Sequence, residues 1–442
     1  MTRAQPPRPP SPLTVILPAA ALSLLLLVGR PAGAGAAGFA IYEQGARAMA
    51  MGGAFAAVAD DPSAMFYNPA GLARADSRQL YVGPSFIVVP ARQFAGIAPY
   101  PGYGVEAEST ADLFYPVNAY LVMPLDGRWT LGAFLNSPFG LKVEWDDPAR
   151  FPGRYVSTHS EVIPFYFGSQ IGVALGEHVA LGGGVTLAHS SVTLRQYLSR
   201  TFVGLDQGAV LDVGTVELEA SNGLDVGFAF GLLVEPAERW NVGFGYRHQI
   251  EIDYEGDADF TQLETGLADL DALIAALLPS DQAARTAFAF PTQWSLGIAT
   301  TALEGWTLAF DWCWTEWSSF DQLRIEFDDP QLAMDRPQGW EDVFSYRLGA
   351  EWRWRPAWAL RAGAYIDDNP QPDRAVSPLL PDADRVGLSL GFGHTFGRYT
   401  IDVYDLVVLF DERSTHGMSQ DRFDGSYQSF ANAIGFDLGI RF

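Results

Sequence analysis

The stretch Gly387–Gly391, with the sequence GLSLG, matches G-x-S-x-G, the pattern around the nucleophilic serine of many hydrolases. That serine attacks an acyl group only when a sharp strand-to-helix turn exposes it beside a histidine. Here Ser389 lies in an alternating segment that predicts a continuous strand. We therefore predict that the protein is not an enzyme. An outer-membrane lipid hydrolase that pairs Ser389 with a histidine is kept as an alternative.

The sequence carries no recognisable signature for metal binding, cofactor binding or energy coupling. The acidic run DYEGDADF lacks the spacing and final glutamate of an EF-hand loop. No GxxxxGK motif is present to bind nucleotide phosphates, and the lone Cys313 excludes an internal disulfide. We predict no catalytic residue, no metal and no cofactor. The six histidines also lack ligand spacing: His159, His178, His189, His248, His394 and His416.

The N-terminus predicts export from the cytoplasm. Two arginines, Arg3 and Arg8, precede the apolar run Leu13–Val28, and Ala34-Gly35-Ala36 fits a cleavage site. We assign residues 1–36 to a signal peptide. The formal net charge is −24, and removal of three arginines with the signal makes it about −27. This balance argues against nucleic acid as a partner, because phosphates need basic surfaces.

Side chains that alternate in type predict long β-strands over most of the mature chain. In residues 240–254 the even positions are mainly apolar or aromatic, whereas the odd positions are small, polar or charged. Arg347 and Arg353 lie on the polar face of another such segment, which suits a polar lumen better than a sandwich core. Strands of this length can cross a bilayer. A sheet of such strands must then close into a barrel, because an open edge would leave backbone groups unpaired in lipid. We predict an all-β fold, a transmembrane antiparallel β-barrel of about fourteen strands in the bacterial outer membrane.

The expected strands have centres spread along the chain, and the last one ends the sequence. Residues 434–442 alternate and stop on Phe442, which resembles the terminal signal read by the barrel-assembly machinery of the outer membrane. The predicted centres are Val82, Ala119, Leu131, Phe167, Val185, Phe228, Phe244, Leu296, Phe310, Leu348, Ala362, Leu390, Val403 and Phe436.

Two segments break the alternation. The first, DDPSAMFYNPAG at residues 60–71, is rich in turn residues yet strongly apolar. The second, about residues 258–290, has helical spacing, with a stripe formed by Leu263, Leu267, Leu270, Ile274, Leu277 and Leu278. Hairpin parity places this helical loop outside the cell. It either caps the rim of the barrel or receives a hydrophobic ligand.

The N-terminal block AGFAIYEQGARAMAMGGAFAAVADDPSAMFYNPAGLA resembles the FadL/TodX (OMPP1) family of outer-membrane transporters of long-chain fatty acids and aromatic hydrocarbons. Further resemblance lies in NSPFGLKVEW, FPGRY and FAFPTQWSLGIA, so that it spans the mature chain. The resemblance implies an N-terminal hatch at residues 37–75 inside a barrel at residues 76–442. It also implies that Asn68, Pro69, Ala70 and Gly71 belong to the gating motif of this hatch.

The resemblance also implies a transport route. Hydrophobic substrate is captured at external loops, passes to a pocket near the hatch and leaves sideways into the outer leaflet through a kink in the third strand. The kink corresponds to Asn136, Ser137, Pro138, Phe139 and Gly140, and Pro138 cannot donate to a strand ladder. The candidate substrate-binding residues are Phe39, Ile41, Phe55, Phe66, Leu267, Leu270, Ile274 and Leu277.

The identity of the substrate stays open at this stage. Long-chain fatty acids are the main hypothesis, uptake of aromatic hydrocarbons is the alternative, and an open porin for polar solutes is a third possibility. A carboxylate ligand requires a cation near the pocket, for which Arg47, Arg74 and Arg154 are candidates. The implied partners are a hydrophobic small molecule, outer-membrane lipid and lipopolysaccharide, and the family points to a monomer.

Overall fold

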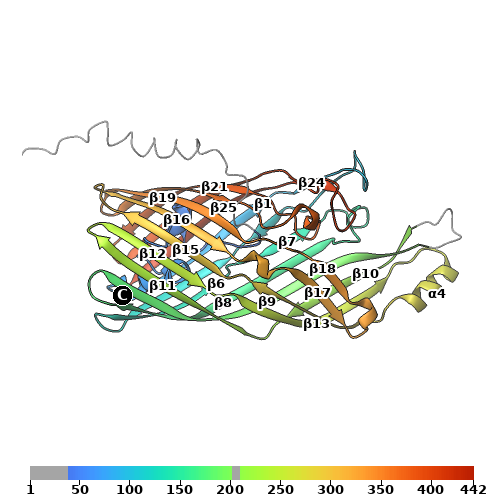
Figure 1. The fold of residues 1–442 in the computed structure, drawn as a ribbon, viewed down its shortest axis with the longest axis horizontal. Helices are drawn as coiled ribbons and strands as arrows, with labels where there is room; N and C mark the ends of the chain where they lie inside the picture. The colour runs from blue at the N-terminus through green and yellow to red at the C-terminus, as the bar shows by residue number, and fades with distance from the viewer. Residues whose placement is uncertain (1–37, 202–209) are drawn as a thin grey trace, which may run out of the picture. The chain divides into compact units, whose positions relative to one another are not determined.

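The computed structural model describes residues 38–201 and 210–442, in which a closed antiparallel β-barrel of fourteen strands dominates (Figure 1). The predicted signal peptide, residues 1–36, lies outside the described residues. Several strands are interrupted by short breaks, so that one crossing of the wall carries two strand labels. No helix in residues 38–201 or 210–442 is both long and apolar enough to cross a membrane.

The crossings follow one another around the barrel in chain order. The first are β1 (Gln79–Val89), β4 with β5 (Asp112–Phe114, Val117–Pro124), β6 with β7 (Trp129–Asn136, Leu141–Glu144), β8 (His159–Ala174), β9 (Val179–Thr201), β10 with β11 (Val210–Ser221, Asp225–Ala237) and β12 with β13 (Trp240–Arg247, Ile250–Gln262). The others are β14 with β15 (Gln282–Phe290, Gln293–Thr300), β16 with β17 (Trp306–Thr315, Gln322–Phe327), β18 with β19 (Met334–Pro337, Val343–Arg355), β20 (Trp358–Asp367), β21 (Arg385–Phe396), β22 (Tyr399–Phe410) and β25 (Phe430–Arg441).

Pairing of the first and last strands closes the barrel. Gln79 lies opposite Arg441, and the register continues to Val88 opposite Asn432. Closure removes the free edge that would leave amide and carbonyl groups unpaired in lipid. All fourteen predicted strand centres fall in different crossings, which confirms the predicted fold class.

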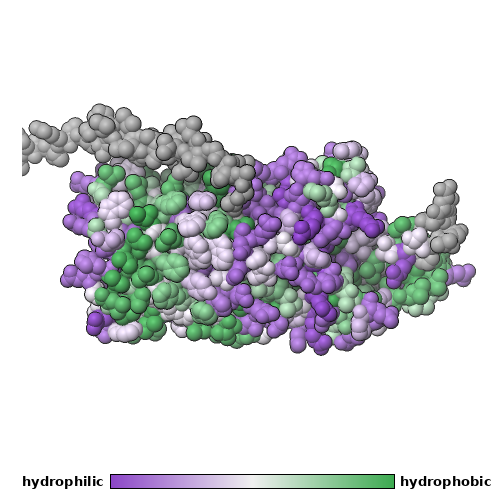
Figure 2. All heavy atoms as spheres, viewed as in Figure 1, coloured by the Kyte–Doolittle hydropathy of each residue, from purple (hydrophilic) through white to green (hydrophobic). Residues whose placement is uncertain are grey.

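The apolar face of each strand points outward, as the alternation predicts. Leu390 and Phe436 are 67% and 46% exposed, whereas the intervening Ser389 and Asp437 are buried. Figure 2 shows apolar residues concentrated over the half of the barrel near the short turns, with hydrophilic residues over the other half. Aromatic side chains cluster on the outer wall near the short turns, as in the interfacial belts of membrane barrels. These include Trp129, Trp240, Trp306, Trp352, Trp354 and Trp358.

The connections are short at one end of the barrel and long at the other. A four-stranded sheet formed by β2 (Gln93–Gly96), β3 (Glu106–Glu108), β23 (Arg413–Ser414) and β24 (Gly425–Gln428) belongs to the long loops. So do α4 (Ala268–Leu277) and the short helices η2 (Trp317–Ser319), η3 (Pro330–Leu332) and η4 (Asp373–Ala375).

The helical loop is shorter than predicted. We expected helical structure over residues 258–290, but α4 covers only Ala268–Leu277. The flanks continue the barrel, because β13 extends to Gln262 and β14 starts at Gln282. The alanines of these flanks favour a helix by local propensity, but the pairing of Ile250–Ala258 with Gln282–Phe290 places them in strands. Figure 1 shows α4 at the end of the barrel opposite the C-terminus.

The N-terminal residues 38–75 lie inside the barrel wall. They contain α2 (Ala46–Ala50), α3 (Ala64–Tyr67) and η1 (Pro69–Arg74). Inward-facing glycines of the wall let the two backbones touch, because an added Cβ at Gly182, for example, would lie 2.2 Å from the carbonyl oxygen of Pro69. Similar contacts occur at Gly172, Gly231, Gly243, Gly245, Gly349, Gly363 and Gly391. The small residues that alternate with aromatic ones therefore make room for this segment.

Candidate functional site

The predicted kink residues interrupt the third crossing of the wall. Asn136 is the last residue of β6, and its pairing with β8 stops at Tyr166. Pairing resumes at Leu141, the first residue of β7, which lies opposite Val162. The ladder is thus broken at residues 137–140, where Pro138 has no amide hydrogen to donate. A gap in hydrogen bonding exists here between two neighbouring strands.

The start of the described chain fills this gap. We call Gly38–Gln44 the leading segment. The amide of Ile41 donates to the carbonyl of Pro138 at 2.8 Å, and the amide of Gly140 donates to the carbonyl of Phe39 at 2.9 Å. Ala40 and Phe139 form an antiparallel bridge between these two bonds. The leading segment therefore pairs with the kink like a one-residue strand.

A cavity lies beside the kink on one side of the leading segment, and we call it the kink cavity. Its apolar lining includes Phe39, Ile41, Ile87, Val89, Phe114, Leu141, Val408 and Phe410. Three cations, Arg92, Lys142 and Arg385, and two carboxyl groups, Glu43 and Asp382, also line it. The kink cavity is consequently amphipathic, with room for a charged head group as well as an apolar chain.

Burial shifts the carboxyl groups of this cavity towards their neutral forms. Loss of solvent raises the pKa of Asp382 to about 6, although Arg385 and the amide of Gly38 act in the opposite direction. That amide donates to Asp382 at 2.8 Å and so ties the leading segment to the loop before β21. Burial also raises the pKa of Glu43, and Arg385 partly offsets this effect. Lys142 also pairs with Asp112 at 3.0 Å and Arg385 with Asp367 at 3.5 Å, so Arg92 is the cation of this cavity that has no ion pair in the described residues.

A second cavity, the apolar cavity, adjoins the kink cavity. Phe39, Leu141 and Leu380 line both. Its remaining lining comes mainly from β8, β9, β10, β14 and β17: Val162, Val192, Leu194, Leu218, Phe288, Leu323 and Ile325, together with Phe320. Phe39 is surrounded by aromatic rings, including Trp317 at 4.8 Å between ring centroids. Near its start the leading segment thus places an aromatic side chain, that of Phe39, between the two cavities.

The residues that follow, Gly45–Ala75, form what we call the anchored segment. The Asn68 side chain donates to the carbonyls of Ala56 at 2.7 Å and Leu232 at 3.0 Å, and accepts from the amide of Ala70 at 3.1 Å. These bonds join three parts of the interior through one amide group. The predicted gating residues Asn68, Pro69, Ala70 and Gly71 are all buried at this place, away from the kink cavity.

The other predicted substrate-binding residues are dispersed. Phe55 packs against Tyr67 in the anchored segment, and Phe66 lines a third cavity beside Arg247. On α4, Ile274 is buried, whereas Leu267 and Leu277 are each 57% exposed and Leu270 is half-buried. Only Phe39 and Ile41 of the predicted set line the kink cavity.

The cations of the kink cavity were missed by reasoning from sequence. Among the three candidates chosen, Arg47 forms ion pairs with Asp60 and Glu351, and Arg154 forms one with Asp212. Arg74 bonds to the side chain of Asn241. The residues found instead, Arg92, Lys142 and Arg385, come from a loop and two strand starts that are distant in sequence. Only the folded chain brings them together.

The serine of the GLSLG motif has a structural contact. Ser389 lies on the inner face of β21, and its hydroxyl accepts from the amide of Gly52 at 3.1 Å. In the parts of the chain that the structure describes, no group of three or more His, Cys, Asp or Glu is placed to hold a metal ion.

Comparison with known proteins shows the family and the fold. The family described as outer membrane protein transport protein (OMPP1/FadL/TodX) matches residues 31–442. The long-chain fatty acid transport protein of Escherichia coli K12 is 23% identical over 407 residues, covering 87% of this chain and 89% of the relative. Outer membrane protein P1 of Haemophilus influenzae is 23% identical over 413 residues, covering 85% and 86%.

Solved structures share the fold. A Pseudomonas aeruginosa FadL homologue superimposes with a TM-score of 0.81 at 21% identity, covering 92% of this chain and all of that chain. The P. putida toluene transporter TodX superimposes with a TM-score of 0.71 at 19% identity, covering 90% and 98%. With the family match spanning the entire barrel, the chain belongs to the OMPP1/FadL/TodX family of outer membrane transport proteins, and its place is the bacterial outer membrane.

Proposed function

We propose that this protein takes up long-chain fatty acids or related hydrophobic compounds across the outer membrane without an energy source. Substrate is captured at the external loops around α4, enters the apolar and kink cavities and leaves sideways through the gap at residues 137–140. The observation that carries the proposal is the pairing of the leading segment with this gap, since Phe39 of this segment lines both cavities.

The lining of the two cavities supports an amphipathic substrate. Each buried methylene group contributes about 0.8 kcal/mol, so an alkyl chain gains strongly from the apolar cavity. A carboxylate finds Arg92, Lys142 and Arg385 in the adjoining kink cavity. Movement of Phe39 would join the cavities and open the kink in one step, because Phe39 lines both and its carbonyl bonds to Gly140.

Aromatic hydrocarbons are a second candidate substrate class. The aromatic rings around Phe39, which include Phe139, Phe290, Trp317 and Trp340, offer edge and face contacts to a small aromatic molecule. One structural neighbour is a toluene transporter. A neutral aromatic ligand makes no use of the three cations, and we therefore rank it second.

A reversible disulfide between the leading segment and the kink tests the route. Ala40 and Phe139 form a non-hydrogen-bonded antiparallel pair, whose typical Cα separation of about 4.5 Å suits a disulfide. We expect cells with Ala40→Cys plus Phe139→Cys to take up labelled oleate only after reduction. Each single cysteine variant is the control, and Cys313 is buried. Normal oleate uptake by the fully oxidised double variant would rule out the proposed gate.

A further inference from the structure

Arg247 differs from the other arginines of the barrel interior. Arg47, Arg347, Arg361 and Arg385 each form an ion pair with a carboxylate: Glu351 at 2.9 Å, Asp367 at 3.1 Å, Asp402 at 2.6 Å and Asp367 at 3.5 Å, respectively. Within residues 38–201 and 210–442, Arg247 forms no ion pair and no hydrogen bond through its side chain. Its guanidinium instead lies over the ring of Phe66, 3.7 Å from the centroid.

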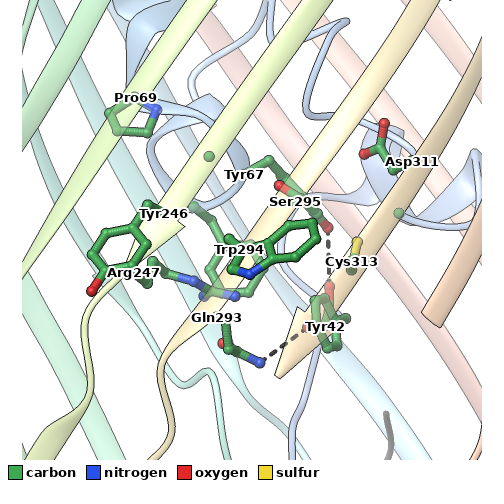
Figure 3. A pocket seen from close by; sticks show the side chains of 13 residues that line it. Tyr42, Tyr67, Pro69, Tyr246, Arg247, Gln293, Trp294, Ser295, Asp311 and Cys313 are labelled. Carbon is green, nitrogen blue, oxygen red and sulfur yellow. Dashed lines mark hydrogen bonds between the residues drawn. The ribbon is translucent and has the colours of Figure 1, made fainter. Parts of the chain in front are cut away.

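The position of Arg247 is fixed by a break in the wall. Arg247 is the last residue of β12 and lies opposite Gln293, the first residue of β15, after which the pairing of these crossings stops until Ile250 and Phe290. Figure 3 shows Arg247 and Gln293 at the strand ends, near Tyr42 of the leading segment. The guanidinium therefore faces a pocket bounded partly by wall and partly by the leading segment.

A second donor points to this pocket. The hydroxyl of Tyr42 accepts a hydrogen bond from the Gln293 amide at 3.0 Å (Figure 3). In the described residues its own hydrogen has no acceptor at hydrogen-bond distance. The one carboxylate in the lining, Asp311, accepts from the amides of Phe55 and Ala56 at 2.8 Å each through one oxygen.

The chemistry of these groups is that of an anion receptor. A guanidinium presents five donors in a planar fork that matches a carboxylate, and charge-assisted bonds are the strong ones. A cation that is partly removed from water without a counter-charge gains most from such a ligand. Ring stacking on Phe66 leaves the edge of the guanidinium plane, where its hydrogens lie, available for an anion.

We propose that Arg247 and Tyr42 form an anion subsite that receives the carboxylate of an amphiphilic substrate beyond the leading segment. The inference rests on the transport function proposed above and adds a selectivity residue to it. Tyr42 lies on this pocket, whereas its neighbours Ile41 and Glu43 line the kink cavity, so the leading segment separates the two sites. Displacement of residues 38–41, with Tyr42 still bonded to Gln293, brings a substrate in the kink cavity within reach of Arg247.

Binding of matched charged and neutral ligands tests this subsite. The full-length mature protein is placed in lipid nanodiscs, and affinities are measured for oleate and for oleyl alcohol, which has the same chain without the charge. We expect Arg247→Gln to weaken oleate binding by about ten- to a hundred-fold, the usual worth of a charge-assisted bond, and to change oleyl alcohol binding less than about two-fold. The control Arg285→Gln removes an arginine that is exposed on β14 and should leave both affinities unchanged.

A purely structural role predicts a different result. If Arg247 only holds the anchored segment by stacking on Phe66, then Phe66→Leu reproduces the effect of Arg247→Gln, and both ligands weaken together. Equal loss for oleate and oleyl alcohol, or no loss for either, overturns the subsite. Retention of oleate selectivity by Arg247→Lys supports it, since the positive charge is kept. If the wild-type protein binds neither ligand, the transport function itself fails, and the subsite fails with it.

Discussion

The leading segment and the anchored segment occupy the same barrel but are held in different ways. The anchored segment is fixed by buried ion pairs: Arg47 bonds to Glu351, which also pairs with Arg361 and Arg353 of the wall. The leading segment is held by hydrogen bonds of its backbone, by side-chain hydrogen bonds of Tyr42 and Gln44, and by aromatic edge contacts of Phe39. From this difference we expect the leading segment to be the more easily displaced of the two.

The contacts with the wall explain this difference in energetic terms. Removing one partner of a buried ion pair costs several kcal/mol, because the other charge stays buried without compensation. Backbone hydrogen bonds like those of Ile41 and Gly140 contribute about 1 kcal/mol each and re-form with water or a neighbouring strand. Ligand binding readily offsets the loss of a few backbone hydrogen bonds, but it offsets the loss of a buried ion pair only with difficulty. A gate built from the leading segment alone therefore leaves the anchored segment in place.

Glu351→Gln is the substitution that we expect to weaken the attachment of the anchored segment most. The change leaves Arg47 and Arg361 with less compensation at the centre of the ion-pair network, so we expect the anchored segment to lose about 3–5 kcal/mol of stability. Loss of its attachment should open the lumen and raise ion conductance in planar bilayers. The matched control is Glu255→Gln, which breaks an exposed pair with Arg285 at 3.7 Å and should change stability by less than about 1 kcal/mol.

An unchanged conductance for Glu351→Gln would show that glycine contacts and backbone bonds hold the anchored segment without the charges. The distinction between the two segments would then lose its electrostatic basis.

A smaller effect is expected from the pH dependence of the leading segment. An aspartate in an unfolded chain titrates near pH 3.9, whereas the pKa of buried Asp382 is raised to about 6. Ionisation is thus disfavoured in the folded state, so the contribution to stability is complete below about pH 4 and is lost as the pH rises through 6. Across this pH range the free energy of unfolding falls by about 2–3 kcal/mol through Asp382. Amide hydrogen exchange of residues 38–44, corrected for its intrinsic pH dependence, measures it.

Asp382→Asn isolates this group. Asparagine keeps an oxygen that accepts from the amide of Gly38 and cannot ionise, so the loss of protection between pH 4 and 6 should shrink. Burial also raises the pKa of Asp61, in the anchored segment, to about 6, and the nearby Arg47 partly offsets this rise. Asp61 is present in the wild-type protein and in the Asp382→Asn variant alike. An identical pH profile in the variant would assign the effect to Asp61 or to another group.

The barrel could be predicted from sequence because its signal is local and repeated. Alternation fixes which side of every strand meets lipid. It placed Arg347 in the interior, where it is 1% exposed, whereas Arg353, predicted on the same face, is exposed near the end of β19. The position of the kink came from the family resemblance, with which Pro138 agrees because it has no amide hydrogen to donate. The extent of α4 did not follow, because the alanine-rich sequence at residues 282–290 fits either a helix or a strand until a partner strand is known.

The candidate site was less predictable, because it depends on which residues remain unpaired after folding. The sequence places Arg247 on the inner face of a strand exactly as it places Arg347, yet only Arg347 finds a carboxylate. Contacts between residues about 20 to 300 positions apart in the chain decide this, as for Arg347 with Asp367 and for Arg47 of α2 with Glu351. Glycines on the inner face were a usable signal for the interior segment, since they leave space that another backbone must fill.

The finest comparison uses two alanine substitutions of similar size. At Gly363 an added Cβ would lie 2.0 Å from the backbone nitrogen of Gly52, which the anchored segment cannot move easily. At Gly140 it would lie 2.6 Å from the terminal Cδ1 of Ile41, which can rotate away. We expect Gly363→Ala to cost about 1–3 kcal/mol in urea unfolding and Gly140→Ala less than about 1 kcal/mol. Gly127→Ala, in a turn with open space around it, is the control. Equal losses of stability for Gly363→Ala and Gly140→Ala would mean that the two segments are held with the same rigidity. The leading segment would then be no better a candidate for the gate than the anchored segment.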